Sequence, residues 1–113
     1  SHGFMHFRFI NGSRKMDAIR SKIDAIDRQM AALYEQRMAL AMDIAEYKYN
    51  NNENIFDSKR DAAVVEKNLK FLKDSGFENY YIAFLHFIMD QSKEVQSQWI
   101  ENQKKNNESH GAE

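Results

Sequence analysis

The hydrophobic residues of this chain follow helical spacing over two long stretches. Apolar side chains that recur every three or four residues form one face of an amphipathic helix. The first series is Ile19, Ile23, Ile26, Met30, Leu33, Leu40, Ile44 and Tyr47, and the second is Ile82, Leu85, Met89 and Trp99. Arg37 occupies a position within the first series, and Ser92 and Gln96 occupy positions within the second. The pattern predicts two long helices that carry polar residues on their apolar faces.

Helix-breaking residues delimit three helices. The chain has no proline, and its four glycines stand at positions 3, 12, 76 and 111. We expect a first helix over about 17–49, ended by the asparagine-rich segment 50–54. A second helix is predicted over about 56–74, with Gly76 as its left-handed C-terminal cap. A third helix is predicted from about residue 79 to beyond Trp99. The inner face of the second helix is predicted to hold Ala62, Val65, Leu69 and Leu72. The fold class is therefore all-α, with one long helix and two shorter ones.

The first helix is too long for one small domain to cover. A helix of about 33 residues is on the order of 50 Å long. A compact domain of this size is only about 35 Å across. The uncovered part of the apolar face is therefore expected to pair with a second copy of the chain, as an intertwined two-fold homodimer.

The length of the chain, 113 residues, indicates one folded domain. Met16 is a candidate natural start, which would make residues 1–15 a leader added for expression. Residues 16–102 are assigned to the helical domain, and 103–113 form a polar tail that is expected to fray.

The charge and residue content exclude several functions. The formal net charge is −1, which gives no sign of a nucleic-acid or membrane partner. No apolar run is long enough to span a bilayer. Cysteine is absent, which excludes disulfides and thiolate chemistry and fits a cytoplasmic protein. No metal-ligand cluster or phosphate-binding glycine loop is visible, so neither a metal nor a cofactor is predicted.

The polar residues on the apolar faces need partners, because burying an unpaired polar group is costly. Arg37 and Lys48 are eleven residues apart, which places them within about 20° of one helix face and about 16 Å apart along it. Ser92 and Gln96 are four residues apart and share a face. Arg20 points about 100° away from Arg37, so it is better placed to reach the site of a partner chain.

The second helix adds a polar face of its own, formed by Asp57, Arg60 and Asp61. Together these residues predict a slot between helices that would suit a small dianion. Fixed donors and charges of this kind serve unimolecular rearrangements or eliminations, in which charge shifts within a bound anion.

Each residue also has a purely structural interpretation. Arg37 is a candidate for an ion pair that fixes helix register, Lys48 for an interaction with the helix dipole, and Asp57 for a helix cap. Ser92 can return its hydroxyl to the helix backbone, and Gln96 can bond between helices. Arg60 and Asp61 can be surface charges.

Four segments resemble motifs of the all-α chorismate mutases. Residues 19–27, Ile-Arg-Ser-Lys-Ile-Asp-Ala-Ile-Asp, resemble the opening helix of that family, and residues 36–41 resemble its second motif, with Lys48 at the expected position. Residues 56–61, Phe-Asp-Ser-Lys-Arg-Asp, are similar to the helix-two motif, and residues 92–96 to a Ser-x-x-x-Gln pattern. The order and spacing of these motifs cover about residues 16–101.

The resemblance implies that the chain converts chorismate to prephenate as an intertwined dimer. It implies that Arg37 and the partner's Arg20 grip the two carboxylates of chorismate, while Lys48 and Gln96 donate to its ether oxygen. An amide donor needs no proton, so activity is expected to persist through neutral pH.

The resemblance also assigns the remaining polar residues. Asp57 and Asp61 would orient the ring hydroxyl, Arg60 would brace that corner, and Ser92 would assist a carboxylate. The family usually has Glu where this chain has Asp61, which is one methylene shorter, and water could fill the gap. Two alternatives stay open: an isochorismate–pyruvate lyase, and a catalytically silent dimer of the same fold that binds or regulates a partner in the shikimate pathway.

Overall fold

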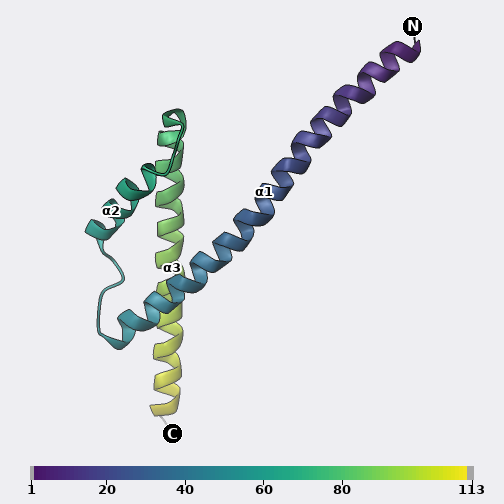
Figure 1. The fold of residues 1–113 in the computed structure, drawn as a ribbon. Coiled ribbons are helices and arrows are strands. Elements are labelled where there is room, and N and C mark those ends of the chain that lie inside the picture. Colours follow the sequence, from purple (N-terminus) through teal and green to yellow (C-terminus); the bar gives the residue numbers. More distant parts are fainter. Residues whose placement is uncertain (1, 112–113) are drawn as a thin grey trace. The chain divides into compact units, whose positions relative to one another are not determined.

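A computed structural model of the chain describes the backbone of residues 2–111 and the side chains of residues 12–109. Helix α1 spans His2–Asn50, α2 spans Ser58–Leu69, and α3 spans Glu78–Gly111 (Figure 1). A single turn of 3-10 helix, η1, spans Ser75–Phe77. No strand occurs among the described residues, which confirms the predicted all-α class with three helices.

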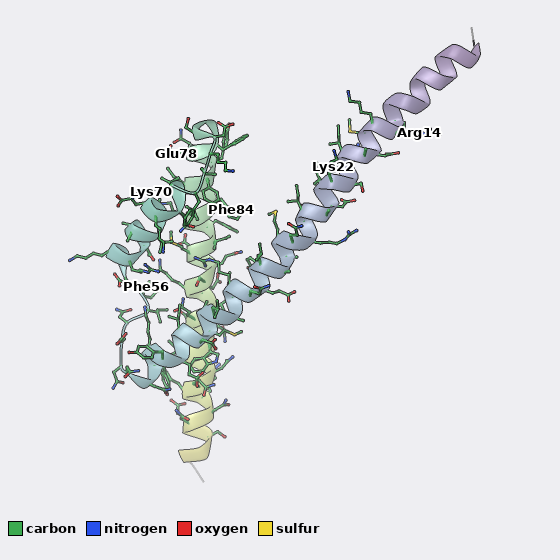
Figure 2. All side chains as sticks on the ribbon, viewed as in Figure 1. Arg14, Lys22, Phe56, Lys70, Glu78 and Phe84 are labelled. Carbon is green, nitrogen blue, oxygen red and sulfur yellow. The ribbon has the colours of Figure 1, made fainter. Side chains whose placement is uncertain are left out.

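The chain divides into two compact units, and each is described by itself. The N-terminal unit is Ser1–Arg37, and its described residues belong to α1. Every side chain from Gly12 to Arg37 is exposed, and in Figure 2 the side chains near Arg14 and Lys22 project on several sides of the helix. The apolar series of this unit shares that exposure, with Leu33 at 62 % of its accessible surface. Its apolar face is thus uncovered in the single chain.

The C-terminal unit, Met38–Glu113, holds the buried core. The buried hydrophobic residues are Met38, Ala41, Ala45, Leu85 and Met89. They come from the last turns of α1 and from α3. Ser92 and Gln96 complete the buried series on α3. The spacing of these α3 residues confirms the series predicted from the sequence.

The end of α1 contacts α3 through one aromatic residue. The ring of Tyr49 lies edge-on to that of Trp99, with centroids 6.1 Å apart. The Tyr49 hydroxyl accepts a hydrogen bond from Asn107 Nδ2 at 2.9 Å. Ala41 and Ala45 precede Tyr49 at four-residue intervals, so they lie on the same face of α1. Ala45 is fully buried, as expected where a small side chain allows close packing.

The face of α1 that is buried in this unit differs from the predicted one. The prediction placed Leu40, Ile44 and Tyr47 in the core, but all three are exposed in the single chain. Each buried position lies one or two residues away in sequence, on a neighbouring face of the helix. Periodicity identifies an apolar face, but it does not say which chain covers it.

An asparagine ends α1, as predicted for the segment 50–54. Asn52 has a φ of 56°, the left-handed conformation that terminates many helices. The Glu53 N–H donates to Lys48 O at 2.8 Å, and the Asn52 N–H donates to Tyr49 O at 3.3 Å. These two bonds form a Schellman motif, which satisfies carbonyls that the helix end would leave unpaired.

Three predicted boundaries were wrong. Helix α1 begins at His2 rather than near residue 17, and α3 continues to Gly111 rather than fraying after residue 102. Neither segment contains a proline that would stop a helix. Helix α2 ends at Leu69, five residues earlier than predicted. Several of its side chains, Val64, Val65, Asn68 and Leu69, are half-buried, whereas Ala62 is exposed.

Gly76 is not the left-handed cap that the sequence predicted. No described glycine has a positive φ, and Gly76 lies inside η1. Asp74 caps this turn by accepting the Gly76 N–H at 2.9 Å. A side-chain cap has therefore replaced the glycine cap at this position.

The conformation of Asn52 predicts how substitutions there affect stability. Asn52→Ala is expected to lower the free energy of unfolding by about 1 kcal/mol, because alanine lacks the short polar side chain whose local hydrogen bonds let asparagine adopt the left-handed region. Asn52→Gly is expected to be neutral or slightly stabilising. Chemical denaturation of both variants measures the difference, and equal stabilities would contradict the assigned helix end.

Candidate active site

Lys48 stands in the last turn of α1, where the Schellman motif fixes its backbone. Its side chain is half-buried and lines a pocket of about 380 Å³. The wall opposite is formed by α3. The lining residues are Lys48, Tyr49, Asn52, Glu53, Asn54, Ile55, Ser97, Ile100, Glu101 and Lys104. Lys48 is the one predicted site residue in this pocket, so the pocket is not the whole predicted slot.

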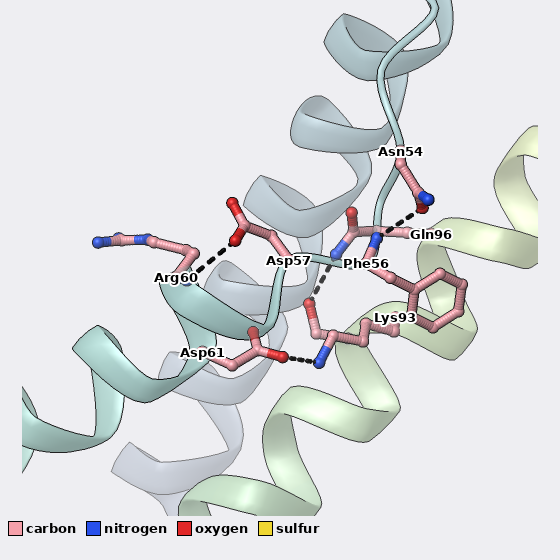
Figure 3. Close-up of polar contacts among 8 residues, drawn as sticks. Asn54, Phe56, Asp57, Arg60, Asp61, Lys93 and Gln96 are labelled. Atoms are coloured by element: carbon pink, nitrogen blue, oxygen red, sulfur yellow. Dashed lines mark hydrogen bonds and ion pairs between the residues drawn. The ribbon is translucent and has the colours of Figure 1, made fainter.

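Ser92 and Gln96 are buried polar residues of α3, with 9 % and 6 % of their surface exposed. Gln96 Nε2 donates to Ser92 Oγ at 3.0 Å, one helical turn away (Figure 3). The burial that the sequence predicted for both residues is confirmed. The bond between them is a finding of the structure, because four-residue spacing places two side chains on one face without showing that they bond to each other.

Gln96 keeps one polar atom without a partner. Its Oε1 is buried and accepts no hydrogen bond. A hydroxyl can donate as well as accept, so turning the amide by 180° would exchange which atom is free but would not remove the deficit. A buried polar atom without a partner costs roughly 1–3 kcal/mol. Such a cost is tolerated most readily where a ligand supplies the missing partner.

Asp57 is the N-cap of α2. Its backbone is extended, with φ −142° and ψ 90°, and its Oδ1 accepts the Arg60 N–H at 3.0 Å. Asn54 Oδ1 accepts the Phe56 N–H at 2.9 Å in the preceding turn (Figure 3). The structural interpretation of Asp57 as a helix cap is confirmed. Asp57 and Arg60 are both exposed, and a carboxylate that caps through one oxygen retains acceptor capacity on the other.

Asp61 forms an ion pair that the sequence analysis missed. Its Oδ2 contacts Lys93 Nζ, which joins the first turn of α2 to the middle of α3 (Figure 3). The two residues are 32 positions apart, and no helical spacing predicts such a contact. The available signal was weak: Lys93 directly follows Ser92 and therefore borders the buried face of α3.

The predicted site residues fall into separate groups. Asp57, Arg60 and Asp61 lie at the start of α2, where Asp61 pairs with Lys93 of α3 (Figure 3). Ser92 and Gln96 lie on the buried face of α3. Lys48 lines the pocket at the end of α1. Arg20 and Arg37 belong to the N-terminal unit and are exposed there. Arg37 was expected to be buried, and in the single chain it is not.

The chemistry of these residues is that of fixed donors and paired charges. Among the described residues, no group of three or more His, Cys, Asp or Glu could hold a metal ion. Within the same part of the chain, no helix is both long enough and apolar enough to cross a membrane. The amide of Gln96 and the ammonium of Lys48 can stabilise negative charge that develops on a bound ligand.

Comparison with known proteins places the chain in a family. A sequence model of the family described as chorismate mutase type II matches residues 19–97. This range includes all eight predicted site residues. A chorismate mutase of Methanocaldococcus jannaschii is 32 % identical over 88 residues, which cover 77 % of this chain and 89 % of that protein.

No solved structure gives a significant match. The family assignment therefore stands on sequence, and the helical architecture agrees with it. The match runs through most of α1, through α2 and into the middle of α3. This chain belongs to the chorismate mutase type II family.

Proposed function

We propose that this chain is a chorismate mutase, which converts chorismate to prephenate. The observation that carries the proposal is the buried, incompletely bonded amide of Gln96 beside Ser92. The family match and the name of the Methanocaldococcus jannaschii relative support the same activity. A protein that only needed to fold would gain stability from an apolar side chain at this position.

The reaction is an intramolecular rearrangement, so the chain need not supply a nucleophile. One carbon–oxygen bond of the ether breaks while a carbon–carbon bond forms, and no proton is transferred. The ether oxygen gains negative charge as its bond breaks, so hydrogen-bond donors aimed at it lower the barrier. Gln96 and Lys48 are the proposed donors. The remaining contribution comes from holding the substrate in a reactive conformation.

The charges of chorismate call for cations on both sides of the slot. Arg37 is proposed to bind one carboxylate and Arg20 of the partner subunit the other. The exposed apolar series of α1 supports a homodimer, because a monomer would leave Ile23, Ile26 and Leu33 in water. Pairing of two such faces around a two-fold axis buries them and brings each Arg20 to the other subunit.

The observed contacts refine the roles proposed for the remaining polar residues. Asp57 and Asp61 are proposed to orient the ring hydroxyl with the oxygens that the cap and the ion pair leave available. Arg60 is proposed to support the part of the site that surrounds the ring hydroxyl. Ser92 fixes the Gln96 amide in addition to its proposed contact with a carboxylate. Nothing in the comparisons supports a lyase or a silent dimer.

A cytoplasmic location is proposed, and the absence of cysteine is compatible with it.

The proposed activity is tested by mixing the purified protein with chorismate and identifying the product. Prephenate is the expected product. Release of pyruvate from isochorismate would instead identify a lyase. If neither compound is turned over, the chain is a catalytically silent member of the family.

Gln96→Met separates catalysis from stability. We expect this variant to lose about 10²–10³-fold in kcat, because a donor to the developing charge is gone. We expect its free energy of unfolding to be unchanged or raised by about 1 kcal/mol, because an unpaired buried polar group is removed. Steady-state kinetics and denaturation measure the two effects.

Gln98→Met is the matched control for that experiment. Gln98 is an exposed residue of α3 whose Nε2 donates to Asn102 Oδ1 at 3.1 Å. The control should retain full activity. A Gln96→Met variant that stays active, or that loses activity only by unfolding, would refute the role proposed for Gln96.

Mixing two inactive variants tests the shared site. Arg20→Ala and Arg37→Ala are each expected to lose most activity while remaining folded, since both residues are exposed in the single chain. Random reassociation makes half of the dimers mixed, and each mixed dimer has one intact site out of two. The mixture should therefore recover about a quarter of wild-type activity per chain.

The same mixture distinguishes the competing arrangement. If both arginines served a site within one chain, no combination of the two variants would restore a complete site. Activity should be followed after co-refolding, with each variant refolded alone as the reference. A mixture as inactive as its components would refute the contribution of Arg20 across the dimer.

A further inference from the structure

Among the described residues, one ion pair joins two side chains, those of Lys93 and Asp61. Asp61 lies in the first turn of α2, and Lys93 follows the buried Ser92 on α3. Their side chains retain 17 % exposure for Lys93 and 28 % for Asp61. The pair is thus largely withdrawn from solvent, where opposite charges interact more strongly than at the surface.

The geometry leaves the carboxylate usable by a ligand. Lys93 Nζ contacts Oδ2 of Asp61, and a carboxylate has a second oxygen with its own acceptor capacity. The contact also restricts the orientation of the Asp61 side chain, which could otherwise rotate. Oδ1 is therefore the atom that remains available to accept from a hydroxyl group.

The charge balance of the site gives Lys93 a second effect. Chorismate carries two negative charges, and a carboxylate that lies unpaired beside its binding site would repel it. Lys93 supplies the opposite charge directly at Asp61. Lys59 and Arg60, the cations nearest in sequence on α2, are exposed, and neither forms an ion pair with Asp61.

We propose that Lys93 is a positioning residue for substrate binding, which holds the Asp61 carboxylate toward the ring hydroxyl and neutralises it against the dianionic substrate. This inference rests on the proposed mutase activity. It assigns a role to a residue at one of the variable positions of the Ser-x-x-x-Gln pattern, where the family resemblance assigns none. Lys93 acts through Asp61, so its effect depends on the negative charge at that position.

A purely structural ion pair would behave differently. Such a pair would tie α2 to α3, and its loss would lower stability with no specific change in the kinetics of the folded protein. A positioning role changes KM in particular, because the repulsion that Lys93 relieves is already present in the substrate complex. The dependence on charge at position 61 separates the two explanations.

The test is a double-mutant cycle of Lys93→Met and Asp61→Asn, measured by steady-state kinetics with chorismate at a temperature where each variant is folded. Lys93→Met is expected to raise KM by about tenfold, a coupling within the range of neighbouring charged residues, with little change in kcat. In the Asp61→Asn background, where no carboxylate charge is present, the same change should leave KM almost unaltered. Lys93→Arg should restore a KM close to that of the wild type.

Lys105→Met is the matched control, because Lys105 is an exposed lysine of the same helix. It removes one positive charge without touching Asp61, and its KM should equal that of the wild type. If Lys93→Met does not fold, Lys93→Gln retains a hydrogen-bond donor without the charge. That variant should then show the rise in KM.

Two results would overturn the inference while leaving the proposed function intact. An active Lys93 variant with an unchanged KM would make the ion pair structural only. An equal rise in KM in the Asp61→Asn background would mean that Lys93 acts on the substrate directly. A wild-type protein that does not turn over chorismate would refute the proposed function itself, and this inference would fall with it.

Discussion

The incomplete hydrogen bonding of the buried Gln96 amide is the constraint on which the rest of this structure depends. The bond of this amide to Ser92 satisfies one atom and leaves another without a partner, inside a helix face that is otherwise apolar. Leu85 and Met89 supply the packing that lets α3 carry this cost. Folding alone would favour an apolar residue, and the proposed role of the amide as a donor to the substrate accounts for its presence. Stability and the proposed function are therefore opposed at this position.

Helix α1 carries two different apolar faces, and only one of them is covered by its own chain. Ala41 and Ala45 pack within the C-terminal unit, while Leu33, Leu40 and Ile44 remain exposed. A single helix can present both faces because its side chains project in all directions. One face builds the subunit, and the other is available to build the proposed dimer. The cations Arg20 and Arg37 lie on the part of α1 that the subunit leaves uncovered.

At the start of α2, residues with an observed structural role are also those proposed to bind the substrate. Asp57 caps the helix through one oxygen, and Asp61 pairs with Lys93 through one oxygen. Each carboxylate is thereby oriented by a contact within the chain, which would lower the entropy cost of the proposed binding. The interpretations of Asp57 as a cap and as a binding residue are therefore compatible.

The sequence by itself determined the three helices, the asparagine-rich end of α1 and the buried series on α3, because these follow from local periodicity and local backbone preference. Its motifs also determined the family. The tertiary structure decided that Asp61 pairs with Lys93, that Gln96 bonds to Ser92, and that Ala41 and Ala45 rather than Leu40 and Ile44 form the core of the subunit. These outcomes depend on which helices meet and at which face, and one-dimensional spacing carries no information about a contact between residues far apart in the chain.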